Sequence, residues 1–383
     1  MEEVKVVIVG AGPSGLATSA CLNYLSIPNI VLEKEDCIAS LWKKRAYDRL
    51  CLHLAKDFCS LPLMSHSAST PTFMSRATFL EYVDNYVAKF DIKPWFHRNV
   101  EKAWLKEEGE NMWRVEARNI ETGEMEVYAS EFLVVASGEN SVANMPEVDG
   151  LKTFGGEIVH SSQYKNGRAY EGKDVLVVGC GNSGMEISFD LSNYGARPSI
   201  VIRSPMHVLK RKMVYLGMVL GKCLPVDVVD SLLIGLAMVK FGDMSAHGIV
   251  RPKLGPMQFK SLTGKTPVID VGTISKIRSG EIKVFPQISN IKGDTVEFEN
   301  GVRKNFDAIV FATGYKSCAN KWLKDYEVVL NERGMPRSQA PNHWKGDKNA
   351  YCVGLSMRGL AGVSADAKAV SQDISNIILT KLK

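Results

Sequence analysis

The chain has 383 residues, of which 45% are hydrophobic and 23% charged, as expected of a soluble globular protein large enough for two domains. Its 47 basic and 42 acidic side chains give a net charge of only +5 without a block of like charge, which argues against nucleic acid as a partner. The eight cysteines form no CxxC pair and no Cys/His cluster, which argues against a metal site and fits a reducing compartment. The N-terminus has no signal-peptide pattern.

The first 34 residues predict a strand, a glycine-rich turn, a helix and a second strand. Residues 4–9 are a continuous apolar run, as expected of a parallel strand that is buried on both faces. A helix is expected from Pro13 to about residue 25, and a second strand over residues 29–33. This order and length are typical of a βαβ unit.

The turn of this unit fits the pattern GxGxxG. Its residues are Gly10, Ala11, Gly12, Pro13, Ser14 and Gly15. The first glycine allows a tight turn, the second lets the backbone approach a pyrophosphate, and the third lets the helix pack close to the strand. Glu33 follows Gly10 by 23 positions and can accept hydrogen bonds from a pair of ribose hydroxyls. The turn therefore predicts a dinucleotide site, with a purely structural glycine turn as the alternative.

The middle of the chain predicts a helix and a small meander. Residues 75–90 have an amphipathic helical pattern. The residues on its apolar side are Phe79, Tyr82, Val83 and Tyr86. Residues 112–118 and 124–135 alternate apolar and polar side chains, which predicts antiparallel strands, and the last strand leads into Ser137 and Gly138.

The opening pattern returns at residue 174, with a strand over residues 174–178, a helix to about residue 193 and a strand over residues 199–203. The residues of this second turn are Gly179, Cys180, Gly181, Asn182, Ser183 and Gly184. Further meander strands are expected near residues 282–285, 288–291 and 295–298. Residues 306–314 then repeat the earlier strand that ends at Gly138.

The sequence thus predicts an α/β fold with two nested dinucleotide-binding domains of the Rossmann-like, glutathione-reductase type, each with a small antiparallel meander. The first domain, for FAD, is expected to comprise residues 1–148 and 306–383. The second, for NADPH, is expected over residues 149–305, with an apolar helical insertion around residues 206–260.

The two copies differ at the end of their second strands. Arg203 follows Gly179 by 24 positions and stands where the first copy has Glu33. An arginine can bind a 2′-phosphate through two hydrogen bonds, whereas an acid would repel it. Arg203, followed by Ser204, therefore predicts NADP(H), with a surface arginine capping a strand as the alternative. Cys180 is interpreted as a small filler, with a thiol activated by the helix N-terminus as the alternative.

Two dinucleotide sites predict that FAD stays bound while NADPH delivers a hydride to it. A disulfide reductase would need a cysteine pair at CxxC or CxxxxC spacing, and the chain has none, so O₂ is the natural electron acceptor. Near the C-terminus, residues 357–362 form a turn, and a helix N-terminus at Gly362 could stabilise the reduced flavin. An ordinary glycine turn is the alternative.

The most apolar stretch covers residues 214–239 and is interrupted by Lys222, Pro225, Asp227 and Asp230. It falls short of the roughly 20 mostly apolar residues that a transmembrane helix needs. We interpret it as a pair of buried or lid helices, with a surface that touches a membrane or an apolar substrate as the alternative.

Residues 154–164, FGGEIVHSSQY, match the flavin-containing monooxygenase pattern FxGxxxHxxx(Y/F) and lie between the two glycine-rich turns. Further segments resemble the plant YUCCA branch of these enzymes. They are residues 33–34, 39–42, 52–54, 61–64, 138–140, 251–252, 264–272, 311–316 and 343–346. The resemblance covers essentially the whole chain, although Cys180 stands where the family commonly has glycine.

The resemblance implies an FAD- and NADPH-dependent monooxygenase that converts indole-3-pyruvate to the auxin indole-3-acetate through a C4a-(hydro)peroxyflavin. It places Lys34, Leu41, Trp42 and His53 at the FAD, and it makes His160 an architectural residue. No catalytic side chain is named, because the flavin carries the chemistry. Implied partners are indole-3-pyruvate and O₂, without nucleic acid or a transmembrane segment. The implied location is the cytoplasm, either free or in peripheral contact with the cytosolic face of the endoplasmic reticulum.

Three other interpretations remain open on the sequence. An N- or S-oxygenating flavin monooxygenase would share the same cofactor motifs. A binding protein that keeps the fold without flavin is disfavoured by the intact glycine turns. An uncoupled NADPH oxidase would release peroxide instead of an oxygenated product.

Overall fold

The computed structural model describes residues 2–106 and 112–381, and these residues form two compact units. The first unit comprises Met1–Arg45, Ala55–Val142 and Tyr315–Lys383, and the second comprises Ala46–Leu54 and Ala143–Gly314. The second unit is therefore inserted along the chain within the first, as the repeated sequence pattern predicts.

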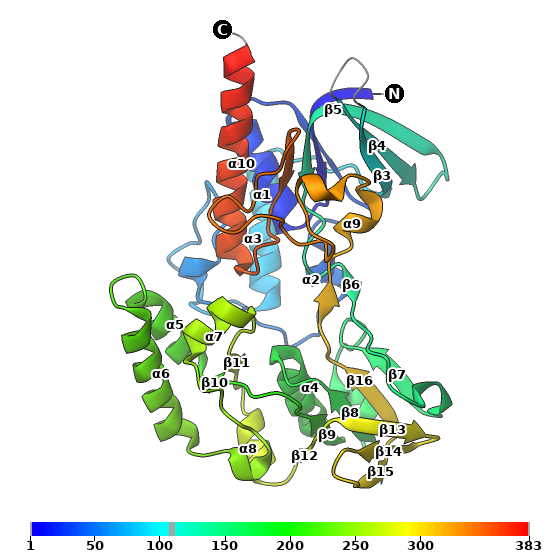
Figure 1. Ribbon diagram of the computed structural model, residues 1–383, viewed down its shortest axis with the longest axis vertical. Helices are drawn as coiled ribbons and strands as arrows, with labels where there is room; N and C mark the ends of the chain where they lie inside the picture. Colours follow the sequence, from blue (N-terminus) through cyan, green and yellow to red (C-terminus); the bar gives the residue numbers. More distant parts are fainter. Residues whose placement is uncertain (1, 107–111, 382–383) are drawn as a thin grey trace. The chain divides into compact units, whose positions relative to one another are not determined.

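A six-stranded sheet lies at the centre of the first unit (Figure 1). Its strands are β1 (Glu2–Val9), β2 (Asn29–Leu32), β3 (Arg98–Lys106), β4 (Met112–Asn119), β5 (Met125–Val135) and β18 (Ala350–Cys352). Their order is β2-β1-β5-β4-β3, and β18 also pairs with β5. β5 is parallel to β1 and β18 but antiparallel to β4. The predicted meander is thus a continuation of the dinucleotide-binding sheet through the long strand β5.

Helices cover this sheet and define its ends. They are α1 (Pro13–Tyr24), α2 (Ser40–Lys44), α3 (Arg76–Lys89), α9 (Ala319–Trp322) and α10 (Gly359–Lys381). α3 begins after Ser75, whose side chain accepts a hydrogen bond from the Thr78 N–H. The amphipathic prediction for α3 is confirmed, because the four residues expected on its apolar side are its buried residues. α1 packs along α10 (Figure 1).

A five-stranded parallel sheet lies at the centre of the second unit. Its strands are β7 (Glu157–His160), β8 (Asp174–Val178), β9 (Arg197–Val201), β12 (Lys283–Phe285) and β16 (Ala308–Phe311). Their order is β12-β9-β8-β16-β7. The helices α4 (Asn182–Asn193) and α8 (Thr273–Arg278) pack against each other beside this sheet. An antiparallel meander is formed by β13 (Ile288–Lys292), β14 (Thr295–Phe298) and β15 (Arg303–Asn305).

Two details of the predicted organisation differ from the structure. The strand expected near residues 282–285 does not belong to the meander, because β12 pairs in parallel with β9. The first unit resumes at Tyr315 and not at residue 306, because β16 is buried and pairs with both β7 and β8. Residues 143–148 and 46–54 also belong to the second unit. The short strands at the two main crossings of the chain are β6 (Val142–Ala143) and β17 (Tyr315–Lys316).

The apolar stretch forms helices, as its pattern predicts. They are α5 (Arg211–Leu220), α6 (Val226–Phe241) and α7 (Pro256–Thr263), flanked by the short strands β10 (Val208–Leu209) and β11 (Val268–Ile269). The buried carboxylate of Asp230 on α6 accepts hydrogen bonds from the N–H groups of Met257 and Gln258, which fixes the start of α7. Among the described residues, no helix combines the length and the apolar character needed to cross a membrane.

Candidate functional site

The first glycine-rich turn links β1 to α1 with a geometry that only glycine allows at two positions. Gly10 has a φ of 110°, and a Cβ atom there would lie 2.6 Å from the carbonyl oxygen of Ala136. A Cβ atom on Gly15 would lie 1.9 Å from the carbonyl oxygen of Gly10. At Gly12, by contrast, a Cβ atom would meet nothing within 4 Å, and this residue lines an open pocket. The turn thus packs tightly on the protein side and leaves space on the other.

The Glu33 carboxylate holds this turn in place. Its Oε2 accepts a hydrogen bond of 2.7 Å from the Ala11 N–H, and its Oε1 accepts one of 3.0 Å from the Glu35 N–H. Burial raises the pKa of Glu33, and the two backbone hydrogen bonds act against that shift. Each carboxylate oxygen retains a lone pair. Glu33 is therefore a structural link within the loop as well as a candidate acceptor for ribose hydroxyls.

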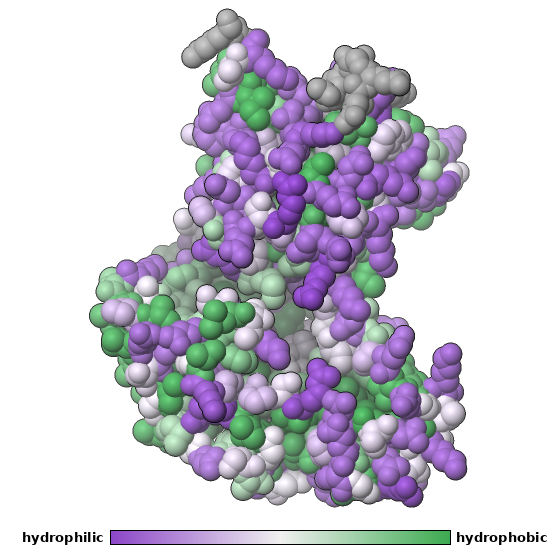
Figure 2. Space-filling view, viewed as in Figure 1, coloured by the Kyte–Doolittle hydropathy of each residue, from purple (hydrophilic) through white to green (hydrophobic). Residues whose placement is uncertain are grey.

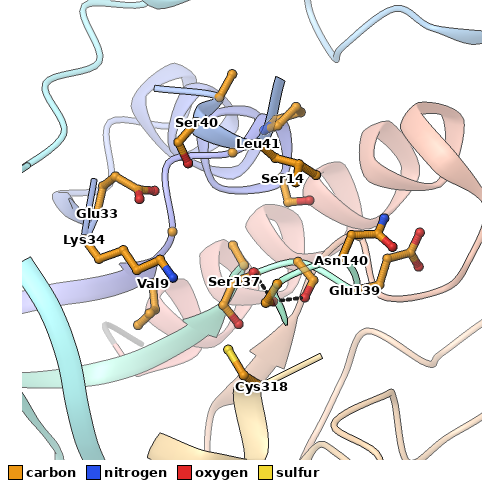
Figure 3. A pocket seen from close by; sticks show the side chains of 18 of the residues that line it. Val9, Ser14, Glu33, Lys34, Ser40, Leu41, Ser137, Glu139, Asn140 and Cys318 are labelled. Atoms are coloured by element: carbon orange, nitrogen blue, oxygen red, sulfur yellow. Dashed lines mark hydrogen bonds between the residues drawn. The ribbon is translucent and has the colours of Figure 1, made fainter. Parts of the chain in front are cut away.

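A pocket of about 310 Å³ opens at this turn, entirely within the first unit (Figure 3). Eight of the residues predicted to bind FAD line it, namely Gly10, Gly12, Pro13, Ser14, Glu33, Lys34, Leu41 and Trp42. Figure 3 shows Glu33 and Lys34 on one side of the pocket, and Ser14, Glu139 and Asn140 on the other. Ala11 and Gly15 support the wall from behind, because both are buried and neither lines the pocket.

The pocket offers unused hydrogen-bonding groups of the kind that a dinucleotide needs. α1 has Gly12 as its N-cap without a side-chain cap, so its first N–H groups can bind phosphate oxygens. The hydroxyl of Ser137 is buried on the pocket wall and has no hydrogen-bond partner among the described residues. Lys34 adds positive charge to the lining, and Arg45, which is ion-paired with Glu35, also lies there. These residues fit a ligand with a pyrophosphate and a ribose, as FAD has.

The C-terminal helix reaches the same pocket, but not through the residue that the sequence indicated. α10 begins at Gly359, and Gly359, Leu360 and Val363 line the pocket. Gly362 is buried within the first turn of α10 and does not line it. A Cβ atom on Gly362 would lie 2.7 Å from the Cβ of Arg358, so this glycine allows close packing of the turn. The predicted helix N-terminus is therefore present, three residues earlier than expected.

The second glycine-rich turn links β8 to α4 and repeats the first closely. Gly179 has a φ of 112°, and a Cβ atom there would lie 2.5 Å from the carbonyl oxygen of Ala312. A Cβ atom on Gly184 would lie 1.9 Å from the carbonyl oxygen of Gly179, and one on Gly181 would meet nothing within 4 Å. Gly181 is the N-cap of α4, again without a side-chain cap. This turn can therefore bind a second pyrophosphate in the same way.

The remaining residues of this turn have distinct contacts. Asn182 begins α4, and its side-chain oxygen accepts a hydrogen bond of 2.7 Å from the Ile269 N–H, which connects the turn to β11. The hydroxyl of Ser183 lies near that of Tyr47. Burial raises the pKa of the Cys180 thiol, which packs against the hydrophobic core. That direction argues against an activated thiolate and favours the interpretation of Cys180 as a filler.

Arg203 and Ser204 follow β9, where the sequence places them. Arg203 is exposed, and within the described part of the chain its guanidinium forms no ion pair. Ser204 is half-buried. An exposed arginine at this position is available for a phosphate, which is the property that the prediction of NADP(H) requires.

His53 is not among the residues that line the pocket of the first unit. It belongs to the second unit, where its Nε2 lies 2.9 Å from Oε1 of Glu186 on α4. The hydroxyl of Tyr47 donates a hydrogen bond to Oε2 of the same carboxylate. Glu186 is only 1% exposed, so His53 and Tyr47 supply hydrogen-bond partners to a buried carboxyl group beside the second glycine-rich turn. The assignment of His53 to FAD, which the family resemblance implies, therefore remains a prediction, and the contacts within the second unit give this residue a structural role as well.

The segment that matches the flavin-containing monooxygenase pattern has structural contacts throughout. The Nε2–H of His160 donates to the carbonyl oxygen of Gly314, and Nδ1 accepts from the Ser162 N–H. Burial lowers the pKa of His160, although the hydrogen bond to Gly314 acts against that shift. The hydroxyl of Tyr164 donates to the buried carboxylate of Asp190. These contacts favour the architectural interpretation of His160.

Sequence reasoning missed a buried pair behind the pocket. Nε2 of His343 lies 2.9 Å from Oδ1 of Asp366, and Oδ2 of Asp366 accepts a hydrogen bond from the N–H of Gly354. Gly354 lines the pocket directly after β18. Gly354 could have been predicted from the topology, because the carboxyl ends of the parallel strands β1, β5 and β18 meet at one edge of the sheet.

Comparisons with known proteins identify the family. Residues 3–333 match the model of the family described as flavin-binding monooxygenase-like. The Arabidopsis thaliana protein described as a probable indole-3-pyruvate monooxygenase, YUCCA10, is 58% identical over 379 residues, which cover 99% of each chain. The chain belongs to the YUCCA branch of the flavin-binding monooxygenase-like family. The Oryza sativa subsp. japonica indole-3-pyruvate monooxygenase YUCCA4 is 48% identical over 96% of this chain and 86% of that protein.

A solved structure of the OTEMO protein in complex with FAD and NADP has a TM-score of 0.76 at 15% identity, covering 99% of this chain and 86% of that one. This likeness confirms the predicted fold with two dinucleotide-binding domains. As a member of the YUCCA branch, the chain is a flavin-dependent monooxygenase.

Proposed function

We propose that this chain catalyses the oxidative decarboxylation of indole-3-pyruvate to indole-3-acetate, using FAD, NADPH and O₂. The observation that carries the proposal is the 58% identity to YUCCA10 over 99% of both chains, together with two intact glycine-rich turns. The overall reaction consumes NADPH, a proton and O₂ and releases NADP⁺, CO₂ and water. A role in auxin biosynthesis follows from the product.

FAD occupies the pocket of the first unit in this proposal. The uncapped N-terminus of α1 binds the pyrophosphate, and Glu33 binds the ribose hydroxyls while it keeps its hydrogen bond to the Ala11 N–H. Ser137 and the N-terminus of α10 complete the wall on which the rest of the cofactor lies. When bound, the flavin accepts a hydride from NADPH and activates O₂.

NADPH occupies the second glycine-rich turn. The N-terminus of α4 binds its pyrophosphate, and Arg203 with Ser204 binds the 2′-phosphate. Glu186 is fully buried between Tyr47 and His53, and this cluster holds α4 against residues 46–54. Its role in this proposal is to position the helix that carries the phosphate-binding N–H groups.

The proposed substrate is a small α-keto acid with an apolar ring, so its recognition requires no partner protein. The reaction takes place in the cytoplasm, either free or at the cytosolic face of the endoplasmic reticulum. The absence of a membrane-spanning helix among the described residues is compatible with either location.

The test is a turnover assay on the purified full-length protein. The yellow protein is mixed with NADPH and indole-3-pyruvate in oxygenated buffer, and indole-3-acetate is quantified against the NADPH consumed. Near-equal amounts support the proposal. Oxidised amines or sulfides in place of indole-3-acetate would reassign the chain to N- or S-oxygenation. Peroxide without a product would make it an uncoupled oxidase, and protein without flavin would refute an enzymatic role.

A further inference from the structure

The helix α6 is apolar on two opposite faces. Val229, Leu233, Ala237 and Phe241 follow one another at helical spacing and are buried in the core of the second unit. The opposite stripe contains Val228, Leu232 and Val239, whose side chains are 52%, 41% and 90% exposed. Gly235 continues this stripe without adding a polar group. A surface helix of a soluble protein normally has polar residues on the side that faces water, so α6 departs from that pattern.

Exposed apolar side chains concentrate on the whole helical insertion. Of the 22 large hydrophobic side chains that are exposed in the described residues, 11 lie within residues 210–265. Besides the stripe on α6, they are Leu216, Val219, Leu224, Val226, Met238, Val250, Leu254 and Leu262. Figure 2 shows hydrophobic residues gathered over the region in which Figure 1 draws α5, α6 and α7. Large exposed apolar patches are rare on monomeric soluble proteins, and they usually mark a surface that binds a partner or a membrane.

The same segment carries the positive charge of the chain. Residues 210–265 contain nine Lys and Arg side chains but only three acidic ones, which gives this segment a net charge of +6. The whole chain has a net charge of +5, so all residues outside the segment together have a net charge of −1. Lys212, Lys222, Lys240, Lys253 and Lys265 are exposed. Of the three acids, Asp230 is buried and engaged at the start of α7.

We propose that the α5–α7 surface, defined as the exposed side chains of residues 210–265, binds the surface of a bilayer that contains anionic phospholipids. Apolar side chains can enter the boundary between headgroups and acyl chains, and lysines around them can pair with the anionic headgroups. The combination of both features in one segment is what this partner requires. A second copy of the chain is a poorer partner, because two faces of charge +6 would repel each other.

The geometry favours binding in the plane of the membrane surface. α6 has 16 residues and is the longest helix of the segment. At about 1.5 Å per residue it is about 24 Å long, which is shorter than a hydrocarbon core of about 30 Å. α5 and α7 are shorter still, with 10 and 8 residues. The segment can therefore lie on a bilayer but does not cross it.

The experiment is vesicle flotation of the purified FAD-loaded enzyme. Vesicles of phosphatidylcholine alone are compared with vesicles that also contain phosphatidylserine, at low and high salt. The stripe variant Val228→Glu/Leu232→Glu/Val239→Glu is compared with the control variant Ile120→Glu/Val302→Glu/Leu379→Glu. The control side chains are 55%, 42% and 55% exposed and lie outside the segment. Both variants change the net charge by the same amount, so only the position of the charges differs.

We expect the wild type to bind anionic vesicles at least about tenfold more than neutral ones, with a loss at high salt. The stripe variant should lose at least about tenfold in binding, whereas the control variant should stay within about twofold. Unchanged reduction of the flavin by NADPH shows that a variant is folded. If the stripe variant fails this check, Lys240→Gln/Lys253→Gln/Lys265→Gln replaces it, and it should lose the preference for anionic lipid.

Any of three outcomes would overturn the inference. The first is a wild type that floats with neither vesicle, and the second is a control variant that loses as much binding as the stripe variant. The third is a wild-type dimer in solution that becomes monomeric in the stripe variant, because the surface would then bind a second copy of this chain.

Discussion

The two glycine-rich turns are nearly identical in backbone and opposite in charge at the end of the following strand. Gly10 and Gly179 have φ values of 110° and 112°, and at both a Cβ atom would clash with the carbonyl oxygen of the residue that follows the neighbouring strand. Gly12 and Gly181 are both open. Yet Glu33 is buried and bonded to two backbone N–H groups, whereas Arg203 is exposed.

This difference separates two tasks that one motif performs. The glycines and the helix N-terminus bind a pyrophosphate, and any dinucleotide has one. The residue after the second strand selects the ribose, through a hydroxyl pair or a 2′-phosphate. The burial of Glu33 also suits a cofactor that stays bound, and the exposure of Arg203 suits one that exchanges in each turnover.

The largest expected effect comes from filling the open glycine of either turn. In Gly12→Leu the side chain would project into the space proposed for the pyrophosphate of FAD. In Gly181→Leu it would project into the space proposed for the pyrophosphate of NADPH. Forcing a side chain into an occupied position costs about 1–3 kcal/mol, so affinity should fall between about tenfold and a hundredfold. We expect Gly12→Leu to be purified without its yellow colour, and Gly181→Leu to stay yellow but to be reduced poorly by NADPH.

Because a Cβ atom on Gly12 or Gly181 would meet nothing within 4 Å, both variants should fold. Far-UV circular dichroism is the check. If Gly12→Leu retained all its flavin, or if both variants lost the same cofactor, the assignment of one turn to each dinucleotide would be wrong.

Arg203 tests the other half of the comparison. A charge-assisted hydrogen bond contributes about 1.5–3 kcal/mol, so Arg203→Ala should raise the KM for NADPH between about tenfold and a hundredfold. NADH has no 2′-phosphate, and its KM should change by less than about threefold. Arg203→Lys is the matched control, which keeps the charge and loses the two-point geometry, and should lie between the two. Equal changes in the KM for NADPH and the KM for NADH would show that Arg203 does not bind the 2′-phosphate.

A second pair of features extends the comparison from the turns to the units. In the first unit, Asp366 accepts hydrogen bonds from the N–H of Gly354 and from the ring of His343. In the second unit, Asp190 accepts hydrogen bonds from the N–H of Gly167 and from the hydroxyl of Tyr164. Gly354 lines the pocket of the first unit, whereas Gly167 is buried within the second unit.

Asp366→Asn should therefore weaken FAD binding, and Asp190→Asn should not. The lost charge-assisted bond contributes about 1.5–3 kcal/mol, part of which we expect to appear as an about tenfold higher Kd for FAD. Both variants should also melt at a lower temperature. Titration of FAD into the flavin-free protein measures the Kd, and the visible flavin spectrum reports any shift of the cofactor. An equal loss of FAD affinity in both variants would make Asp366 a residue of general stability only.

Local patterns were sufficient to predict much of this molecule. The spacing of Gly10, Gly12 and Gly15 identifies the turn, and the steric demand on Gly15 is local, because a Cβ atom there would meet the carbonyl oxygen of Gly10. The apolar side of α3 follows from periodicity alone. The charge difference between Glu33 and Arg203 could also be recognised from the local sequence, because each residue follows the second strand of its βαβ unit.

Contacts between distant segments could not be predicted in this way. β18 completes the pocket by pairing with β5, more than 200 positions earlier in the chain. Residues 46–54 join the second unit because Asp48 bonds to Lys165 and His53 to Glu186, which are more than 100 positions away. No local pattern in residues 46–54 indicates that they join the second unit.

The smallest expected effect concerns the response of the second unit to pH. Burial lowers the pKa of His160 below the value of about 6.5 that the unfolded chain has. Its Nδ1 accepts a hydrogen bond from the Ser162 N–H, which a protonated ring could not do. The folded state therefore binds a proton at His160 less readily than the unfolded state does. The stabilisation by His160 is complete above about pH 6.5 and is lost as the pH falls toward the folded pKa, by up to about 1.4 kcal/mol per pH unit.

The six tryptophans allow this effect to be assigned to one unit, because all of them lie in the first unit. Tryptophan fluorescence thus follows the melting of the first unit, while circular dichroism follows both units. On acidification from about pH 7.5 to 5.5, the circular dichroism transition should shift to lower temperature more than the fluorescence transition. In His160→Gln the shift should be smaller but not absent, because burial also lowers the pKa of His207 in the same unit. An unchanged shift in His160→Gln would mean that other groups cause the acid sensitivity of the second unit.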